Sequence, residues 1–291
     1  MSLYKYVPPE RLDVLRNLSI RFTQPAAQND PFEFRPLVVR FRRPGVAGQE
    51  LLEQWDKKFP ETVDQLDSES QVRLKGFMRK FPGAVAAVRE LRLCQADRQT
   101  DPATGEGIFQ ELNRQVGILS LSEIPDSFLL WCRYASGQSG FVYEFDDKHP
   151  WFWAKTEAKD DIHELRKVNY VDVPSSSYLS ELAASEVLYS KRRNWEHERE
   201  WRIIRPFVES SERAGEDLYL FKVPPAALTA VIVGSSATQD SIQGLVQVIA
   251  SNPDLAHLRV GCAHYIPPDC VVEIEYWPGS VAQIRTELRL A

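Results

Sequence analysis

Short segments in which apolar and polar residues alternate recur along the whole chain, and they constrain its fold more than any other feature. In the segment 18–24, Ile20 and Phe22 fall on one face of a strand, and Arg21 and Thr23 fall on the other. Similar patterns, or short apolar runs bounded by turn residues, predict further strands. These lie at 3–7, 117–122, 141–146, 164–172, 200–206, 218–223, 230–235 and 270–277.

Segments with helical spacing separate these strands, at 9–17, 127–135, 177–189 and 239–251. The two kinds of segment do not follow a strict βαβ rhythm, so we predict an α+β fold with a mixed or antiparallel central sheet. Strands 3–7, 18–24 and 200–206 are expected in the region of that sheet. Helical spacing dominates residues 49–115, which we interpret as a mostly helical insertion within a single domain covering residues 1–291.

Composition narrows the class of protein. The 291 residues are 43% hydrophobic, which is enough for a substantial core. No apolar run reaches the roughly 18 to 20 residues that cross a bilayer, and the first residues, MSLYKYVPPE, do not resemble a signal peptide. We therefore expect a cytoplasmic protein with no membrane partner. A net charge of −6 argues against a broad nucleic-acid-binding surface.

Common catalytic and metal-binding motifs are missing. The chain contains no GxxxxGK[ST], GxGxxG, GxSxG or HExxH sequence. None of the five histidines is paired at the spacing of a helical metal site, and none of the four cysteines forms a C-x-x-C pair. We therefore predict no tightly bound transition metal.

The segment 191–202, KRRNWEHEREWR, is the most unusual in the chain. If it is extended, Glu196, Glu198, Glu200 and Arg202 share one face. A row of carboxylates that ends in an arginine is costly to bury unless it binds something or is paired internally. The alternative is a solvated, salt-bridged helix end in which Glu196 and Glu200 lie one turn apart.

Two further places are candidates for a site. Asn29 and Asp30 follow the strand that carries Arg21 and Thr23, although Asn-Asp-Pro is also an ordinary turn. Trp131 and Tyr134 stand one helical turn apart, so their rings are either stacked on a planar ligand or packed in the core.

Three blocks together resemble a bacterial family catalogued as domain of unknown function 2971. They are YKYVPPERLDVLRNLSIRFTQPAAQNDPFE, LSLSEIPDSFLLWCRYASGQSGFVYEFD and KRRNWEHEREWRII, and they span most of the chain outside the helical insertion. That resemblance implies no particular chemistry.

The chain also resembles the ADP-ribosyltransferase superfamily. Its members carry an Arg or His on an early strand, a Ser, Thr or Tyr on a later one, and a catalytic Glu, often within E-x-E, on another. Lys5 or Tyr6, then Thr23, then Glu198 and Glu200 meet that order, with Lys5 where the family has Arg or His.

The resemblance implies NAD as the substrate, either of a transferase whose protein or nucleic-acid acceptor the sequence does not identify, or of an NAD-hydrolysing enzyme. Glu200 would stabilise the oxocarbenium-like transition state, and Glu198 would orient the acceptor. The pyrophosphate would meet Arg21 or Arg202, and Trp131 or Tyr134 would stack on a ring. The remaining residues expected to bind the nucleotide are Tyr4, Lys5, Tyr6, Thr23, Asn29 and Asp30.

Two alternatives belong to other classes. A magnesium-dependent phosphodiesterase or nuclease would gather Asp30, Glu33, Glu198 and Glu200 around the ion. A non-catalytic module would use the same residues to bind a nucleotide or a partner, as a component of a bacterial toxin or phage-defence system. A site predicts that these distant residues converge on one cleft.

Overall fold

The computed structural model describes residues 1–30, 33–36, 102–153, 164–172, 184–215, 217–268 and 271–277. The chain divides into two compact units. The first comprises Met1–Phe34, Phe109–Val173 and Ala184–Ala291, and the second comprises Arg35–Ile108 and Pro174–Ala183. Within the predicted helical insertion, residues 102–115 form the helix α5 (Pro102–Gln115), and residues 49–101 lie outside the described residues.

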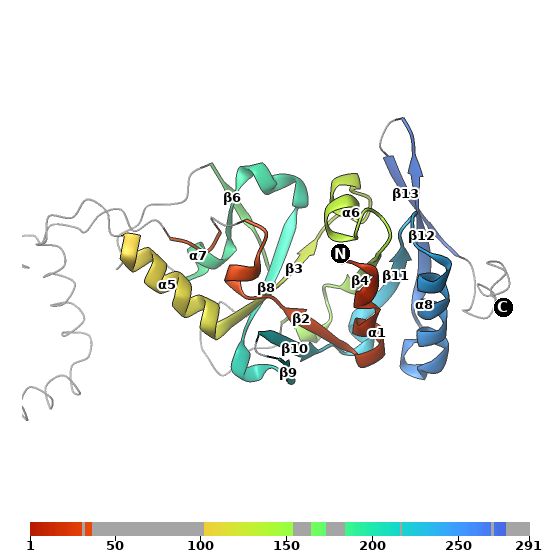
Figure 1. Cartoon of the computed structure of the whole chain (residues 1–291), viewed down its shortest axis with the longest axis horizontal. Coiled ribbons are helices and arrows are strands. Elements are labelled where there is room, and N and C mark those ends of the chain that lie inside the picture. Colours follow the sequence, from red (N-terminus) through yellow and green to blue (C-terminus); the bar gives the residue numbers. More distant parts are fainter. Residues whose placement is uncertain are drawn as a thin grey trace, which may run out of the picture. The chain divides into compact units, whose positions relative to one another are not determined.

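An eight-stranded mixed sheet runs through the first unit, so the predicted α+β class with a mixed central sheet is confirmed (Figure 1). Its β11 and β12 are parallel, whereas its other neighbouring strands are antiparallel. In sheet order the strands are β13 (Val271–Tyr276), β12 (Arg259–Ile266), β11 (Leu228–Val233), β4 (Phe141–Asp146), β1 (Ser2–Val7), β3 (Val116–Ser122), β8 (Glu200–Pro206) and β5 (Arg166–Lys167).

The middle strands of this sheet are covered on both faces. In β4, Phe141, Tyr143 and Phe145 enter the larger hydrophobic core, whereas Val142 enters a smaller one with Trp131. Alternate residues of a strand point to opposite faces, so the two cores lie on the two sides of the sheet. The near-continuous apolar run of β4 follows from this double coverage.

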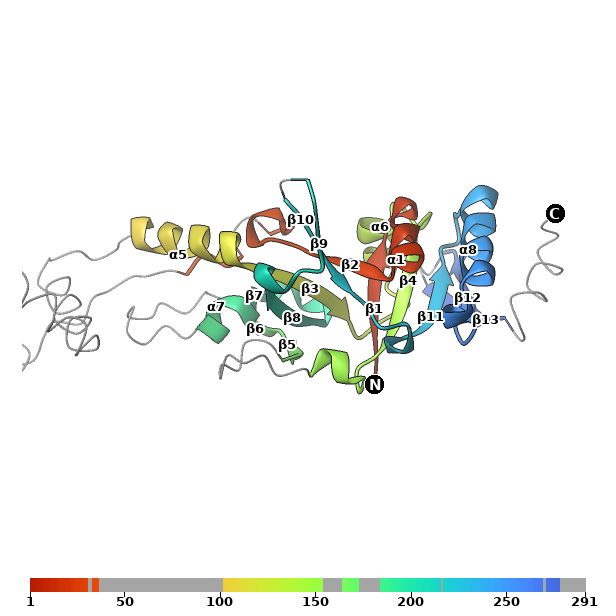
Figure 2. The same cartoon turned by 90° about the horizontal axis from the view of Figure 1, so that it is seen from below.

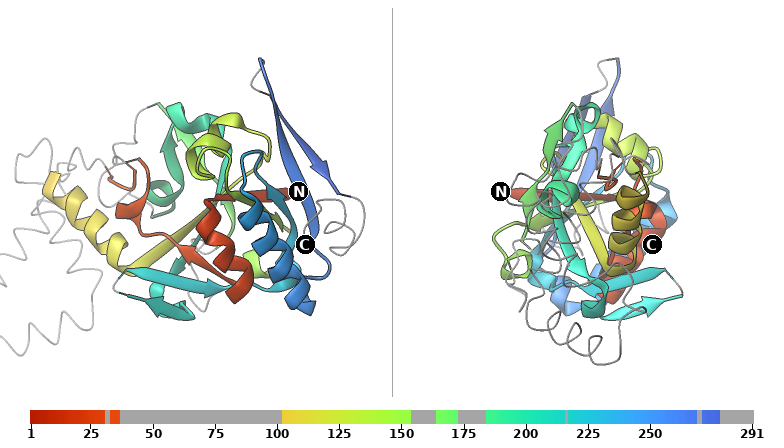
Figure 3. Two further views of the ribbon diagram at one scale, coloured as in Figure 1. Left: turned by 45° about the vertical axis from the view of Figure 1, so that its right-hand side comes forward. Right: turned by 90° about the vertical axis from the view of Figure 1, so that its left-hand side faces the viewer.

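Helices cover these two faces. On the larger core, α1 (Asp13–Asn17), which follows the 3-10 helix η1 (Pro9–Leu12), lies beside α8 (Gln239–Ser251) (Figures 2 and 3). Thr238 caps α8 by accepting a hydrogen bond from the backbone N–H of Ser241. On the smaller core, α6 (Phe128–Tyr134) begins after Ser127, whose side chain accepts from the backbone N–H of Leu130.

Two small sheets complete the described strands. One contains β2 (Ser19–Phe22), β10 (Leu218–Lys222) and β9 (Glu212–Ala214), and the other joins β6 (Asn169–Val171) to β7 (Ser190–Arg192) in parallel. Residues 18–24 were expected in the region of the central sheet, but residues 19–22 form a strand of a separate sheet. The strand β2 pairs with β10, and a bridge between Thr23 and Ile118 links the end of this segment to β3.

Other predicted elements differ in their extent. The segment 164–172 divides into β5 and β6, and β12 was not expected. The predicted helix at 177–189 is described only as α7 (Ala184–Tyr189), since 177–183 lie outside the described residues. Among the described helices, none combines the length and the apolar character needed to span a bilayer.

Candidate functional site

A cavity of about 250 Å³ lies in the first unit, where β1, β3 and the start of β8 meet α6 and the loop after β2. The register between β1 and β3 places Tyr4 opposite Ser122, and residues on either side of this pair line the cavity. The lining consists of Tyr4, Lys5, Tyr6, Arg21, Thr23, Ala27, Gln28, Asn29, Ser120, Leu121, Ser122, Leu130, Tyr134, Lys191, Glu198 and Glu200.

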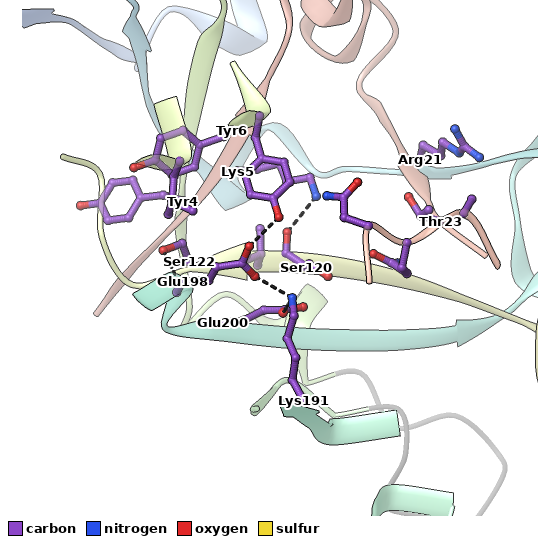
Figure 4. A pocket seen from close by; sticks show the side chains of 16 residues that line it. Tyr4, Lys5, Tyr6, Arg21, Thr23, Ser120, Ser122, Lys191, Glu198 and Glu200 are labelled. Atoms are coloured by element: carbon purple, nitrogen blue, oxygen red, sulfur yellow. Dashed lines mark hydrogen bonds and ion pairs between the residues drawn. The ribbon is translucent and has the colours of Figure 1, made fainter. Parts of the chain in front are cut away.

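The two ends of the cavity differ in charge. Figure 4 shows Glu198, Glu200 and Lys191 together at one end, and Arg21 and Thr23 toward the other. Segments far apart in the sequence thus meet at one place, as expected for a site rather than for separate structural features.

A turn in the backbone brings the two glutamates of the E-x-E sequence together. Residues Arg193–Glu198 form the 3-10 helix η6, and Arg199 then adopts a left-handed conformation with φ 43° before β8 begins at Glu200. This conformation is unfavourable for a residue other than glycine. It turns Glu198 and Glu200 toward Lys191, whereas Glu196 is exposed and pairs with Arg193. Glu196 therefore does not share a face with the other carboxylates, as an extended strand would require.

Lys191 on β7 is held between the two glutamates. Its Nζ lies 2.6 Å from Oε2 of Glu198 and 2.7 Å from Oε2 of Glu200, and 4.0 Å from Oε2 of Glu33. Burial alone would lower the pKa of Lys191, but attraction to the three carboxylates outweighs it and raises the pKa. Lys191 is therefore a permanent cation in the wall of the cavity.

Arg202 lies behind Glu200 and is fully enclosed, with 1% of its side chain exposed. Its Nε donates to Oε1 of Glu200 at 2.7 Å, and its Nη1 donates to the carbonyl of Leu188 at 2.7 Å. Its Nη2 donates to the carboxylates of Glu33 and Glu200. The expectation that Arg202 meets a pyrophosphate is therefore wrong, because its guanidinium is used internally and does not line the cavity.

Glu200 and Glu33 respond differently to this environment. Burial favours the neutral form of Glu200, yet Arg202 and Lys191 hold its pKa below the usual range. For Glu33, burial outweighs the same two cations and raises the pKa. The backbone N–H of Glu200 also donates to the hydroxyl of Tyr170 at 2.9 Å. Glu200 is thus fixed as a carboxylate.

Of the two aromatic candidates on α6, one faces the cavity and one does not. The Tyr134 hydroxyl donates to Oε1 of Glu198 at 2.5 Å, and burial and the nearby charge of Glu198 raise the pKa of Tyr134. Trp131 is 0% exposed, donates to the carbonyl of Pro125 at 2.8 Å, and meets the ring of Tyr6 edge-on. The proposed stacking of Trp131 on a ligand is therefore wrong, since its ring belongs to the core.

The strand β1 contributes three neighbouring residues to the wall. Lys5 Nζ donates to the carbonyl of Ser120 at 2.9 Å, and the Tyr6 hydroxyl donates to the carbonyl of Ile124 at 2.8 Å. Tyr4 completes the set, and burial followed by repulsion from Glu144 raises its pKa. Burial lowers the pKa of Lys5 to about 8, although Glu200 and Glu198 oppose this change.

The loop after β2 forms the remaining wall. Arg21, Thr23 and Asn29 line the cavity. Asp30 does not line it. The Asp30 side chain is buried and accepts a hydrogen bond from Nε1 of Trp195 at 3.0 Å, so it ties this loop to η6.

The structure thus brings most of the predicted residues together. Those that line the cavity are Tyr4, Lys5, Tyr6, Arg21, Thr23, Asn29, Tyr134, Glu198 and Glu200, and those that do not are Asp30, Trp131 and Arg202. Sequence reasoning missed Ser120, Ser122 and Lys191 as lining residues. Both serines alternate with leucines in the segment 119–122, and this polar face was the available signal.

The carboxylates of this site are engaged with cations. Glu198 and Glu200 bond Lys191, and Glu33 bonds Arg202. Within the described ranges, no group of three or more His, Cys, Asp or Glu side chains is arranged to hold a metal ion. A magnesium ion at these carboxylates would have to displace Lys191 or Arg202.

The chain matches no family model, no curated protein and no solved structure.

Proposed function

We propose that this cavity binds NAD as a substrate, and that the chain is an ADP-ribosyltransferase-like enzyme that cleaves the nicotinamide-ribose bond. The observation that carries the proposal is the meeting of three neighbouring strands at one cavity. Lys5 on β1, Ser120 and Ser122 on β3, Glu200 at the start of β8, and Glu198 at the end of the preceding η6 all line it. The resemblance to the superfamily predicts these three kinds of residue on separate strands.

Ser120 and Ser122 fit this scheme better than Thr23. The strand β3 lies between β1 and β8 in the sheet, whereas Thr23 follows β2, which belongs to another sheet. The Ser122 hydroxyl also donates to the backbone carbonyl of Glu198 at 2.7 Å. The serine that completes the proposed site is therefore in direct contact with the glutamate segment.

The geometry favours Glu198 rather than Glu200 as the carboxylate that stabilises the transition state. Cleavage of the nicotinamide-ribose bond places positive charge on the ribose, and a fixed carboxylate lowers the energy of that charge. Glu200 is bonded to both Lys191 and Arg202, so most of its charge is compensated. Glu198 shares the charge of Lys191 with Glu200, and the other described hydrogen bond to its carboxylate comes from the neutral Tyr134 hydroxyl. In this proposal Glu200 positions Lys191, and through it Glu198.

The size of the cavity suits one half of the dinucleotide. Sites that enclose a whole drug-sized ligand measure about 300–1,000 Å³, and this cavity measures about 250 Å³. We assign it to the nicotinamide-ribose half, with the ring beside Tyr134 and the ribose against Glu198. In this proposal Arg21, which lines the other end of the cavity, meets the pyrophosphate.

One observation favours a second candidate, a non-catalytic module that binds a nucleotide or a partner. The charges of Glu200, Lys191 and Arg202 are satisfied within the protein, as in a rigid binding pocket. The ion pairs of Glu33, Glu198 and Glu200 with Lys191 and Arg202 count against the magnesium-dependent alternative, because the cations occupy the carboxylates that would bind the ion. Membership of domain of unknown function 2971, a cytoplasmic location, and a role in a toxin or phage-defence system remain part of the proposal.

Release of nicotinamide from NAD tests the proposal. We expect release by the wild type, with cell lysate supplying the acceptor, and the same rate with EDTA. Glu198→Gln should retain NAD binding and lose at least a hundredfold in rate, because the amide keeps the shape but lacks the charge. Glu196→Gln is the matched control, since this exposed carboxylate lies on the same 3-10 helix outside the cavity.

Each other outcome has a definite meaning. Loss of release in Glu200→Gln but not in Glu198→Gln would return the charge-stabilising role to Glu200. Binding of NAD without release under any of these conditions would favour the binding module. Release that depends on a divalent cation would support a metal-dependent reaction instead.

A further inference from the structure

Two lysines line the cavity in contrasting environments. Lys191 Nζ bonds two carboxylates, at 2.6 and 2.7 Å, and is a permanent cation. Lys5 Nζ donates to a neutral acceptor, the backbone carbonyl of Ser120, at 2.9 Å. When it is charged, this amino group carries three hydrogens, so two remain to point toward the cavity beside the one bonded to Ser120. When it is neutral, its lone pair can point there instead.

The pKa of Lys5 is correspondingly low. Burial lowers its pKa from 10.5 to about 8, Glu200 and Glu198 oppose this change from a distance, and Arg11 and Lys191 reinforce it. With that pKa, about a tenth of the amine is neutral at pH 7 and about half at pH 8. An ordinary lysine is neutral in less than about one molecule in a thousand at pH 7. Only the neutral amine is a nucleophile.

We propose that Lys5 is a nucleophilic amine that forms a Schiff base with an aldehyde or ketone bound in the cavity. The neutral Nζ attacks the carbonyl carbon to form a carbinolamine. Loss of water, which carries the carbonyl oxygen and the two hydrogens of the amine, then leaves the C=N bond. The step needs no oxidant or reductant. It stands on the surroundings of Lys5 and does not require NAD to be the substrate.

Arg21 restricts the class of carbonyl compound. Arg21 lines the same cavity, one terminal nitrogen of its guanidinium donates to Oε1 of Gln24 at 3.3 Å, and its Nε is buried without a hydrogen-bond partner among the described residues. A buried donor of this kind favours an anionic acceptor. The expected ligand is therefore an aldehyde or ketone that carries a phosphate or carboxylate. In Figure 4, Lys5 points into the cavity between the glutamates and Arg21.

The probe is pyridoxal 5′-phosphate, an aldehyde that bears a phosphate, followed by reduction with borohydride and peptide mass spectrometry. At pH 8 and limiting probe, we expect Lys5 to be labelled at least tenfold faster than Lys222. Lys222 is the matched control, because it also donates to a backbone carbonyl, that of Asn17 at 3.2 Å, but on the exposed surface. Lys191 should remain unlabelled.

The pH dependence separates reactivity from mere access. Labelling of Lys5 should rise severalfold from pH 7 to pH 8 and level off above about pH 9, since its amine is then neutral. The charged and titratable groups around it are Glu198, Glu200, Lys191, Arg11, Arg21, Tyr4, Tyr6, Tyr134 and Tyr143. Lys5→Arg keeps a cation but has no nucleophilic amine, so the label should be lost from that tryptic peptide while the thermal unfolding midpoint is retained.

Labelling of Lys5 no faster than Lys222, or labelling of Lys191 in its place, would overturn the proposal. Protection of Lys5 by NAD would connect the amine to the proposed NAD site. Rapid labelling that NAD does not slow would uphold the reactive lysine and count against NAD as the ligand, so the two proposals fail separately.

Discussion

Replacement of Arg202 by methionine tests the internal ion pairs that fix the glutamates. Methionine has a similar length and no charge, so it fills the space while leaving Glu33 and Glu200 to face Lys191 alone. Arg202 is 1% exposed, and Glu33 and Glu200 are 2% and 5% exposed, so water cannot solvate the carboxylates that remain. The carbonyl of Leu188 also loses its donor.

Removing one partner of a buried ion pair costs about 3–5 kcal/mol, because the other charge stays buried and unpaired. Typical domains are stable by about 5–15 kcal/mol, so this is a large fraction of the total. Each kcal/mol lowers the Tm by about 2–4 °C in a domain of 150–250 residues. We therefore expect Arg202→Met to lower the Tm by roughly 6–20 °C.

Thermal unfolding measures the change in Tm, and urea unfolding followed by tryptophan fluorescence and by circular dichroism measures the loss in free energy of unfolding. Arg193→Met is the control, since Arg193 is 50% exposed and pairs with Asp172, which is 74% exposed. Exposed pairs contribute about 0–1 kcal/mol, so the control should unfold almost as the wild type does. Adding Glu33→Gln to Arg202→Met should recover part of the loss, because one unpaired charge disappears. Equal losses in Arg202→Met and Arg193→Met would refute the reasoning.

Three further predictions concern the core, a close approach of the backbone, and pH. Trp131→Ala should cost about 3–5 kcal/mol in urea unfolding, because it opens a cavity in the core, and a loss of ligand affinity with unchanged stability would contradict its place there. Gly234→Ala should also lower the free energy of unfolding, since a Cβ there would lie 2.0 Å from the carbonyl oxygen of Gln138. Gly215→Ala is the comparison, because its Cβ would meet no atom within 4 Å and the variant would suffer only the backbone strain of φ 70°. Because the folded-state pKa of Glu200 lies below its ordinary value of 4.5, Glu200 contributes stability above about pH 4.5 that is lost as the pH falls further. Glu200→Gln should lose less stability than the wild type between pH 5 and pH 3.5, and an identical loss in the two proteins would contradict this assignment.

The strands that carry the site were predictable because local sequence determines them. Residues 200–206 form β8 as predicted, and the residues of β1 and β4 follow their predicted segments closely. Which strands pair with one another was not predictable from local sequence. The strand β2 pairs with β10, nearly two hundred residues later, and no local pattern distinguishes that partner from the central sheet.

Side-chain roles depended on contacts that the sequence does not encode locally. Trp131 and Tyr134 lie on the same short helix, but only the tertiary packing of Tyr6 and Pro125 around Trp131 separates the core residue from the cavity residue. Lys191 was seen as part of a charged run. Its position between two glutamates depends on the parallel pairing of β6 with β7 and on the left-handed turn at Arg199.

Calorimetric titration with NAD of two variants of the loop after β2 tests the central claim, that this cavity is the nucleotide site. Ala27 lines the cavity and is exposed, so Ala27→Trp fills the cavity without disturbing the core. Ala26 is its exposed neighbour and does not line the cavity, so Ala26→Trp is the matched control. We predict that NAD binds the wild type and Ala26→Trp alike and binds Ala27→Trp at least tenfold more weakly. Equal affinity of Ala27→Trp and the wild type, or no binding to the wild type, would contradict the assignment of this cavity.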